Sequence, residues 1–221
     1  MANRMPTVSA DLLYYLRDTS LRETDVQRQL RYTTNTLPES GWEVAPEQAQ
    51  FLAFLVQITE AKRILELGTF TGHSSLAMGL ALPRDGQLIT CDMQPKFTDI
   101  AMTHWAKAGI QHKITLRLGP ALDTLSDLLE EGHEGYFDMA FIDANKKDYD
   151  AYYEGVLKLI KPRGLVAIDN IFWNGKVLDD TNTEKSTNAI RALNEKIHND
   201  ERVSLSMLPW NDGLTLTWKR P

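Results

Sequence analysis

The chain has 221 residues, which suits one domain with a full hydrophobic core. Its net charge of −6, from 24 basic and 30 acidic residues, argues against a broad nucleic-acid interface, which needs clustered lysine and arginine. Cys91 is the only cysteine, so an intrachain disulfide is excluded, and no apolar run resembles a secretion signal or reaches the ~20 residues of a membrane span. We therefore expect a cytoplasmic protein with neither nucleic acid nor membrane as a partner.

Residues 1–45 are expected to form a helical extension in front of the first strand. Ser9 is a candidate N-cap for a helix that reaches Asp18 and carries three leucines on one stripe, and a charged helix is expected over 23–32. The extension has no glycine motif of its own. We expect it to cover the core or to bury its apolar stripe in a homodimer contact, while residues 46–221 form the catalytic core.

The stretch from Arg63 to Ser75 combines a short apolar run, a glycine turn and the start of a helical pattern. This order places a ligand over the helix N-terminus, at the carboxyl end of the sheet. The third turn position is Phe70, which is too bulky for the pyrophosphate of NAD, and Glu66 just before the turn would repel that group but bind an ammonium. The spacing therefore favours S-adenosylmethionine, and an NAD-dependent oxidoreductase is disfavoured.

Strands and helices alternate along the rest of the chain. Helices are expected at 46–61, 74–82, 97–110, 121–131, 148–160 and 186–197. Strands are expected at 64–67, 86–93, 113–119, 136–144, 164–173, 202–209 and 214–220. The alternation predicts an α/β, doubly wound, mostly parallel seven-stranded sheet with helices on both faces. The turn at 211–213 makes the last two strands a hairpin, so the C-terminal strand is expected to be antiparallel.

Two polar residues near the glycine turn are candidates for binding the methyl donor. Asp92 ends the second strand, 24 positions after Gly68, where a carboxylate accepts the ribose hydroxyls of a nucleoside. Alternatively, Asp92 caps the helix that follows. Ser74 lies at the start of the helix expected at 74–82, where it either donates to the carboxylate of the ligand or caps the helix.

Three oxygen-bearing side chains follow two of the apolar strands. Asp143 ends the strand "MAFID", and Asp169 and Asn170 end "LVAIDN". The carboxyl ends of neighbouring parallel strands meet at one edge of a sheet, and two carboxylates with an amide oxygen suit Mg²⁺. The alternative is that Asp143 caps a helix and the pair shapes a turn.

Further candidates lie close to these strand ends in the sequence. Lys146, three residues after Asp143, is either a base at the same place or a solvated surface charge. Trp173 and Asn174 follow the pair at the end of the next strand, and they are candidates for the wall of an aromatic substrate site. The alternative for the tryptophan is ordinary core packing.

Five motifs in one order then carry a family resemblance: "ELGTFTGHSSLAMGLALP", "GPALDTL", "FIDANKKDY", "DNIFWNGKV" and "MLPWNDGLTL". From about Pro46 to its C-terminus the chain resembles the cation-dependent O-methyltransferases of the caffeoyl-CoA and catechol type. The resemblance implies the Rossmann-like fold of class I S-adenosylmethionine-dependent methyltransferases, and it supports the expected homodimer. It implies donor contacts at Val44, Glu66, Gly68, Thr69, Ser74, Asp92, Ala121 and Asp143. It also implies a divalent metal held by Asp143, Asp169 and Asn170, with Lys146 as general base.

The chain departs from the family pattern at a few positions. Trp42 stands where methionine is frequent, His73 where tyrosine is frequent, and Asn211 where glycine is frequent. The region before Thr36 matches poorly, so a CoA ester is not carried over as the substrate.

The predicted function is the metal-dependent methylation of a small phenolic molecule with neighbouring hydroxyls, of the catechol or caffeoyl kind. One alternative is a methyltransferase of the same fold acting on nitrogen or RNA, which is disfavoured because such reactions need no cation. The other is a non-catalytic S-adenosylmethionine-binding protein. It is disfavoured by the intact Lys146 and the intact set of metal ligands.

Overall fold

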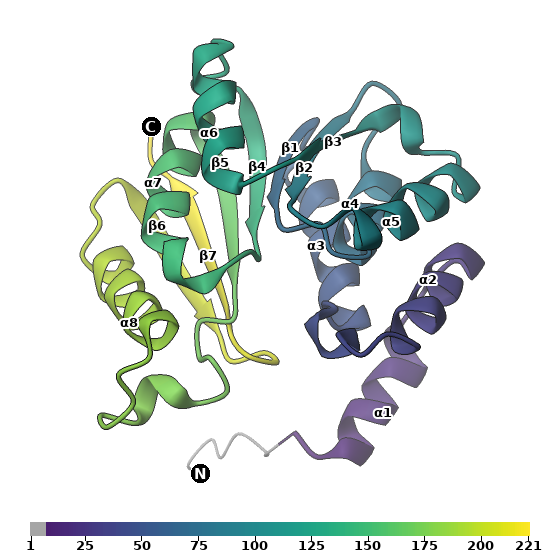
Figure 1. Cartoon of the computed structure of the whole chain (residues 1–221), viewed down its shortest axis with the longest axis horizontal. Coiled ribbons are helices and arrows are strands. Elements are labelled where there is room, and N and C mark those ends of the chain that lie inside the picture. Colours follow the sequence, from purple (N-terminus) through teal and green to yellow (C-terminus); the bar gives the residue numbers. More distant parts are fainter. Residues whose placement is uncertain (1–7) are drawn as a thin grey trace.

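The computed structural model describes residues 8–221, which form a sheet with helices on both faces (Figure 1). The seven strands lie in the order β3-β2-β1-β4-β5-β7-β6. They are β1 (Arg63–Leu67), β2 (Gln87–Asp92), β3 (Ile114–Leu118), β4 (Phe137–Ile142), β5 (Ile160–Asp169), β6 (Val203–Leu208) and β7 (Leu214–Lys219). Strands β1 to β5 pair in parallel, and β7 is antiparallel to β5 and β6. The predicted fold class is confirmed.

The helices alternate with the strands as predicted. They are α1 (Ala10–Ser20), α2 (Asp25–Asn35), α3 (Pro46–Ile58), α4 (His73–Ala81), α5 (Pro95–Lys107), α6 (Ala121–Glu130), α7 (Tyr149–Leu159) and α8 (Lys185–His198). Within residues 8–221, none of the helices combines the length and the apolar character needed to cross a bilayer. The bounds of the helices and strands agree with the predicted ones to within about three residues, with one exception.

The exception is β5, which begins and ends four residues earlier than the predicted strand at 164–173, with Asn170 at φ +59° directly after its last residue. Ile160 pairs with Phe137 of β4, and regular pairing resumes only at Leu165, opposite Met139. Residues 161–163 are exposed and include Arg163 at φ +67°. Because these polar residues bulge out of the ladder, the sequence pattern placed them in a loop.

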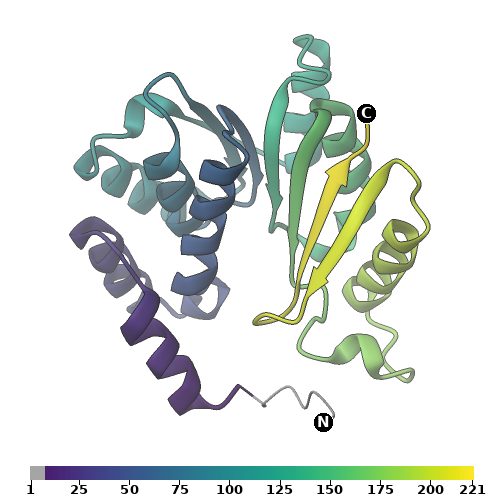
Figure 2. The ribbon, with the colours of Figure 1, turned by 180° about the vertical axis from the view of Figure 1, so that it is seen from behind.

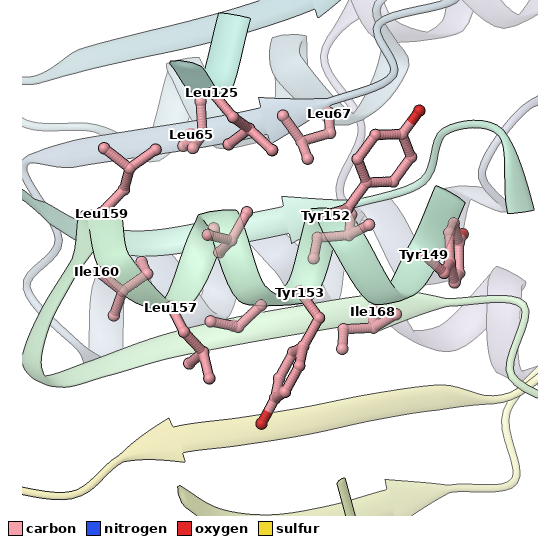
Figure 3. Close-up of a cluster of buried hydrophobic side chains, with 14 of the residues drawn as sticks. Leu65, Leu67, Leu125, Tyr149, Tyr152, Tyr153, Leu157, Leu159, Ile160 and Ile168 are labelled. Carbon is pink, nitrogen blue, oxygen red and sulfur yellow. The ribbon is translucent and has the colours of Figure 1, made fainter. Parts of the chain in front are cut away.

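Side chains of the central strands alternate between two apolar layers. Leu65 and Leu67 of β1 face α6 and α7, where Tyr149 and Tyr153 pack against the sheet (Figure 3). Ile64 faces the opposite layer, which α3 and α4 cover. Since both faces of the parallel sheet are buried, its central strands are apolar almost throughout. Polar residues are left to the strand ends, and these converge at the carboxyl edge.

The N-terminal helices begin where their capping residues predict. Ser9 caps α1, with its Oγ accepting from the backbone N–H of Leu12 at 3.2 Å, and Thr24 and Gln27 form a capping box at the start of α2. Leu30 of α2 is fully buried against α4 and α5. In contrast, α1 has no buried residue and lies at the edge of the molecule in both views (Figure 1, Figure 2).

Candidate active site

A cavity of about 850 Å³ opens at the carboxyl ends of β1, β2, β4 and β5. Open α/β sheets bind their ligands at this edge. The predicted site residues on its wall are Val44, Gly68, Thr69, Ser74, Asp92, Ala121, Asp143, Lys146, Asp169, Asn170, Trp173 and Asn174. The structure therefore brings together the residues assigned to donor, metal and substrate, with the exception of Glu66.

The glycine turn after β1 is held against the end of β4. Gly68 has φ +97°, and a Cβ at this position would lie 2.1 Å from the carbonyl oxygen of Asp143. The backbone N–H of Asp143 in turn donates to the carbonyl of Leu67 at 2.8 Å. Only glycine permits this close approach of two backbones. The turn thereby places the donor wall next to the candidate metal ligands.

Asp92 holds the same turn from the β2 side. Its Oδ2 accepts from the backbone N–H groups of Thr69 and Phe70 at 3.1 and 2.8 Å, and its Oδ1 accepts from that of Gln94 at 2.9 Å. The alternative role as a helix cap is wrong, because the N-cap of α5 is Gln94. The carboxylate is thus fixed at the cavity wall, beside the glycine turn.

Glu66 lies beneath the cavity wall. Its side chain is fully buried, and its two carboxylate oxygens accept from the hydroxyls of Ser74 and Thr90, each at 2.6 Å. Ser74 therefore neither caps α4 nor points freely into the cavity. Burial raises the pKa of Glu66 to about 8, although the two hydroxyls act against the shift. Whether Glu66 contacts the donor stays a prediction.

The raised pKa of Glu66 predicts how stability depends on pH. The folded protein keeps this carboxyl protonated up to pH of about 8, whereas the unfolded chain releases the proton near its ordinary value of 4.5. The stability contribution is therefore complete below pH 4.5 and is lost as the pH rises towards 8. Between pH 5 and 8.5, the melting temperature of Glu66→Gln should therefore fall less than that of the wild type. Circular dichroism measures both.

The control for this prediction is Glu130→Gln, at an exposed position of α6. Glu43 and Asp169, whose pKa values burial raises to about 7, contribute with the same sign in every variant. The difference between Glu66→Gln and the wild type therefore isolates Glu66. Parallel pH curves for the two proteins would contradict the prediction.

Lys146 lies inside the cavity wall, so the surface-charge alternative is wrong. The residue is only 9% exposed, its Nζ donates to Oδ1 of Asp143 at 2.6 Å, and Nζ lies 5.0 Å from the ring centre of Tyr149. Asp143 does not cap a helix, because the short 3₁₀ turn that follows is capped by Asn145. The pair therefore places an amine and a carboxylate at one point of the cavity.

Asp169 and Asn170 extend this group of oxygen atoms from the end of β5. Asp169 is 5% exposed, and burial together with the negative charge of Asp143 raises its pKa to about 7. Asn170 has φ +59°, and its backbone N–H donates to Oδ1 of Asp169 at 2.8 Å. A buried carboxylate and a half-buried one that repel each other, with an amide beside them, fit a divalent cation.

The cluster differs from the common metal sites made of ionisable side chains. Within residues 8–221, no three or more His, Cys, Asp or Glu side chains form a group able to hold a metal ion. The predicted ligand set has two carboxylates, and its third member is the amide of Asn170. Hard oxygen donors of this kind select Mg²⁺ or a similar ion rather than zinc.

Trp173 and Asn174 bring the loop after β5 to the cavity. Both have positive φ, +49° and +53°, and Trp173 is half-buried with its indole Nε1 lacking a partner among the described residues. Asn174 is exposed, and its backbone N–H donates to Oδ1 of Asp212 in the β6–β7 turn. The tryptophan therefore lines the cavity and also packs against the hydrophobic core, so both interpretations hold in part.

Gln48 of α3 is a wall residue that the sequence reading missed. It is 2% exposed, its Oε1 accepts from Nδ2 of Asn211 at 3.0 Å, and its amide counteracts the raised pKa of Asp169. The signal available in the sequence was a pair of polar residues, Glu47 and Gln48, at the start of a mostly apolar helix. Both are buried in the structure.

Comparisons with known proteins agree with this fold and cavity. A family model described as O-methyltransferase matches residues 17–220. The chain is 43% identical over 210 residues to probable caffeoyl-CoA O-methyltransferase 2 of Dictyostelium discoideum, covering 94% of this chain and 91% of the relative. It is 42% identical over 215 residues to catechol O-methyltransferase domain-containing protein 1 of Mus musculus, covering 97% and 82%.

Solved structures of O-methyltransferases also resemble this chain. An O-methyltransferase from Bacillus cereus in complex with SAH superposes with a TM-score of 0.87 at 31% identity, covering 94% of this chain and 96% of that one. The O-methyltransferase TomG from Streptomyces achromogenes, in complex with SAM, has a TM-score of 0.86 at 31% identity, with coverages of 94% and 95%.

The sheet order and the cavity at its carboxyl edge are those of a Rossmann-like methyltransferase. The chain belongs to the O-methyltransferase family. The protein is therefore an enzyme that transfers a methyl group from S-adenosylmethionine to oxygen, as its motifs predicted.

Proposed function

We propose that this enzyme methylates one hydroxyl of a small phenolic molecule with two neighbouring hydroxyls, and that Asp143, Asp169 and Asn170 hold a divalent cation, Mg²⁺, for the reaction. The observation that carries the proposal is that these oxygen donors and Lys146 share one cavity wall with the glycine turn. Cytoplasmic location and the lack of nucleic-acid or membrane partners stay predictions.

The cavity residues have separate roles in the proposed methylation. A free phenol has a pKa of about 10, so little phenolate exists at neutral pH. When bound, a divalent cation lowers the pKa of a hydroxyl that it contacts. In its neutral amine form, Lys146, placed at the same point, would accept the phenolic proton at Nζ. Asp92 and the glycine turn orient the donor, and Trp173 confines the aromatic ring. The methyl group then passes in a single in-line displacement, without a covalent enzyme intermediate.

A substrate screen tests this proposal. Catechols and hydroxycinnamoyl esters are incubated with labelled S-adenosylmethionine, with and without Mg²⁺. We expect label transfer to compounds with two neighbouring hydroxyls and none to matched monophenols. S-adenosylmethionine should raise the melting temperature of the protein and NAD should not. Transfer to an amine or an RNA, independent of the cation, would overturn the proposal.

Asp92→Ala should weaken donor binding. A lost charged hydrogen bond costs about 1.5–3 kcal/mol, so the affinity for S-adenosylmethionine should fall roughly tenfold to a hundredfold. Calorimetry measures the affinity, and circular dichroism checks that the fold is retained. Asp99→Ala, at an exposed position of α5, is the matched control and should bind as the wild type does. Unchanged affinity of Asp92→Ala would remove this residue from the donor site.

We also propose a homodimer, supported by apolar surface at two places. On α1, Leu12, Tyr15 and Leu16 are 40, 66 and 37% exposed. Figure 2 shows the side of β5, β7 and β6 on which no helix of the described chain lies in front of them, and Trp218 on this side is 39% exposed. Apolar surface of this kind is typical of an interface between copies.

Light scattering at micromolar concentration should therefore give about twice the chain mass of 25.1 kDa. The double variant Leu12→Glu and Leu16→Glu should shift the protein towards the monomer, because two charges would be buried in the contact. Tyr32→Glu, an exposed residue on α2, is the control. A strictly monomeric wild type would contradict the proposal.

A further inference from the structure

His73, the first residue of α4, connects two parts of the cavity wall. Its side chain is 2% exposed, and its Nδ1 lies 3.1 Å from the carbonyl oxygen of Val44. Val44 belongs to the segment 41–45, which precedes α3 and lines the cavity over its whole length. His73 thus forms a hydrogen bond between α4 and that segment, beside the apolar packing of Val44 in the cluster that contains Ala77 and Met78.

The protonation of His73 follows from its surroundings. Burial lowers its pKa to about 4, so the imidazole is neutral at the pH where the enzyme works. A carbonyl oxygen only accepts hydrogen bonds, so the single ring proton is on Nδ1 and is donated to Val44. Nε2 has no hydrogen-bond partner within the described chain. A neutral ring with its proton engaged in this way is suited to holding backbone in place.

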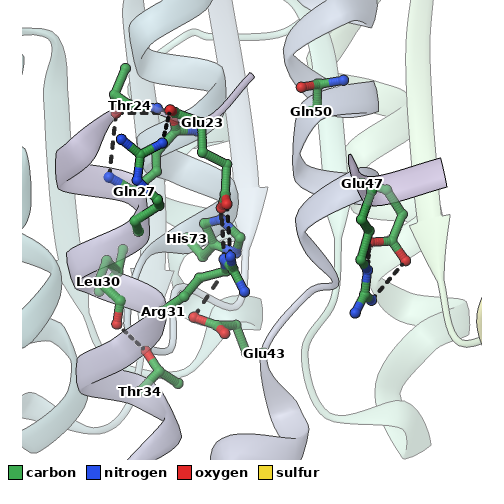
Figure 4. Close-up of polar contacts among 12 residues, drawn as sticks. Glu23, Thr24, Gln27, Leu30, Arg31, Thr34, Glu43, Glu47, Gln50 and His73 are labelled. Atoms are coloured by element: carbon green, nitrogen blue, oxygen red, sulfur yellow. Dashed lines mark hydrogen bonds and ion pairs between the residues drawn. The ribbon is translucent and has the colours of Figure 1, made fainter. Parts of the chain in front are cut away.

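The N-terminal extension packs around the same imidazole (Figure 4). Glu23 lies 3.8 Å from Nε2 and accepts two hydrogen bonds from Arg31 of α2, at 2.6 and 2.7 Å. Glu43, from the wall segment itself, lies 3.9 Å from Nδ1. The hydroxyl of Thr34 on α2 donates to that of Thr71 in the glycine turn at 2.8 Å. Helix α2 therefore braces both the segment and the turn.

We propose that His73 is a positioning residue for the methyl donor, holding segment 41–45 against the donor end of the cavity through its hydrogen bond to Val44, with α2 as a brace. This inference rests on the proposed donor site. A wall segment that is ordered before binding does not have to lose its conformational freedom on binding, so the donor binds more tightly. The extension is then part of the donor site rather than a cover alone.

Four variants test the proposal. His73→Leu removes the bond at similar volume. His73→Asn places an amide N–H near the position of Nδ1, and His73→Gln places one near Nε2. The matched control is His104→Leu in α5, because His104 is 4% exposed and its Nδ1 contacts the carbonyl of Ile100 in its own helix, at 2.8 Å.

Calorimetry should show that the affinity for S-adenosylhomocysteine falls roughly fivefold in His73→Leu and His73→Gln. His73→Asn should keep most of the wild-type affinity. The KM for the donor should rise with the affinity loss while kcat changes little. Without any ligand, backbone amides of 41–45 should exchange hydrogen faster in His73→Leu and His73→Gln. His104→Leu should change neither quantity.

The outcomes separate this inference from the proposed function. If His73→Leu binds the product and exchanges at 41–45 like the wild type, the positioning role is overturned. Equal loss in the Asn and Gln variants would also overturn it, and this pair decides the matter if the Leu variant does not fold. If the wild type itself binds no S-adenosylhomocysteine, the proposed donor site fails, while the exchange experiment still tests the contact between His73 and the segment.

Discussion

Removal of divalent cations with EDTA is expected to abolish methylation of a catechol, and Mg²⁺ is expected to restore it. Asp169 is buried and Asp143 is half-buried, and burial together with the negative charge of Asp143 raises the pKa of Asp169. A divalent charge relieves this repulsion and is held by it. Asp169→Asn keeps the shape of the side chain but removes one charge, so turnover should fall roughly a hundredfold or more.

Donor binding and metal binding should respond differently to Asp169→Asn. Binding of S-adenosylhomocysteine to Asp169→Asn should stay within about twofold of the wild type, because this carboxylate is not assigned to the donor. Calorimetric titration with Mn²⁺ should show weaker binding in the variant. Asp123→Asn, at an exposed position of α6, is the control. Full activity of EDTA-treated, metal-free protein would refute the proposed mechanism, whatever family the chain belongs to.

Gly68→Ala is expected to destroy the donor site. The backbone at this position has φ +97°, and the added Cβ would meet the carbonyl oxygen and carbon of Asp143 at 2.1 and 2.8 Å. Both are backbone atoms of the adjoining strand end, so neither moves without displacing the candidate metal ligand. We expect a loss of about 3 kcal/mol or more in the free energy of unfolding, and donor affinity lowered at least a hundredfold.

Gly109→Ala is the control that introduces backbone strain without a steric clash. Gly109 also has positive φ, +71°, but a Cβ there would meet no atom within 4 Å. Its substitution should cost about 1 kcal/mol in chemical denaturation and leave donor binding unchanged. Similar losses in the two variants would show that the close approach of Gly68 to Asp143 does not matter.

Much of the candidate site was predictable because its residues end strands. Asp92, Asp143 and Asp169 each follow an apolar run, and parallel strands place such ends at one edge. The family motifs added Val44 and Ala121, which also lie on the cavity wall. Burial of Lys146 was not predictable, because "NKKD" reads as a polar turn until the rings of Tyr149 and Trp173 are packed beside it.

The residues that escaped the sequence reading make contacts across long stretches of chain. Gln48 meets Asn211, 163 positions away, and His73 meets Val44, 29 positions away. Neither pair has a spacing in the sequence that indicates a contact. Glu66 also illustrates the limit, since the sequence placed it next to the glycine turn but not beneath the cavity wall, where its side chain accepts a hydrogen bond from Ser74.

By itself, the sequence determined the order of strands and helices and the kind of residue at each strand end. The reason is that periodicity, capping and burial on both faces of a parallel sheet act over a few neighbouring residues. Only the tertiary structure decided which polar side chains share the cavity, which are buried and which pair with one another. Those properties depend on the strand order and on how α2 and α3 pack against the loops, and both are set by contacts between residues far apart in the chain.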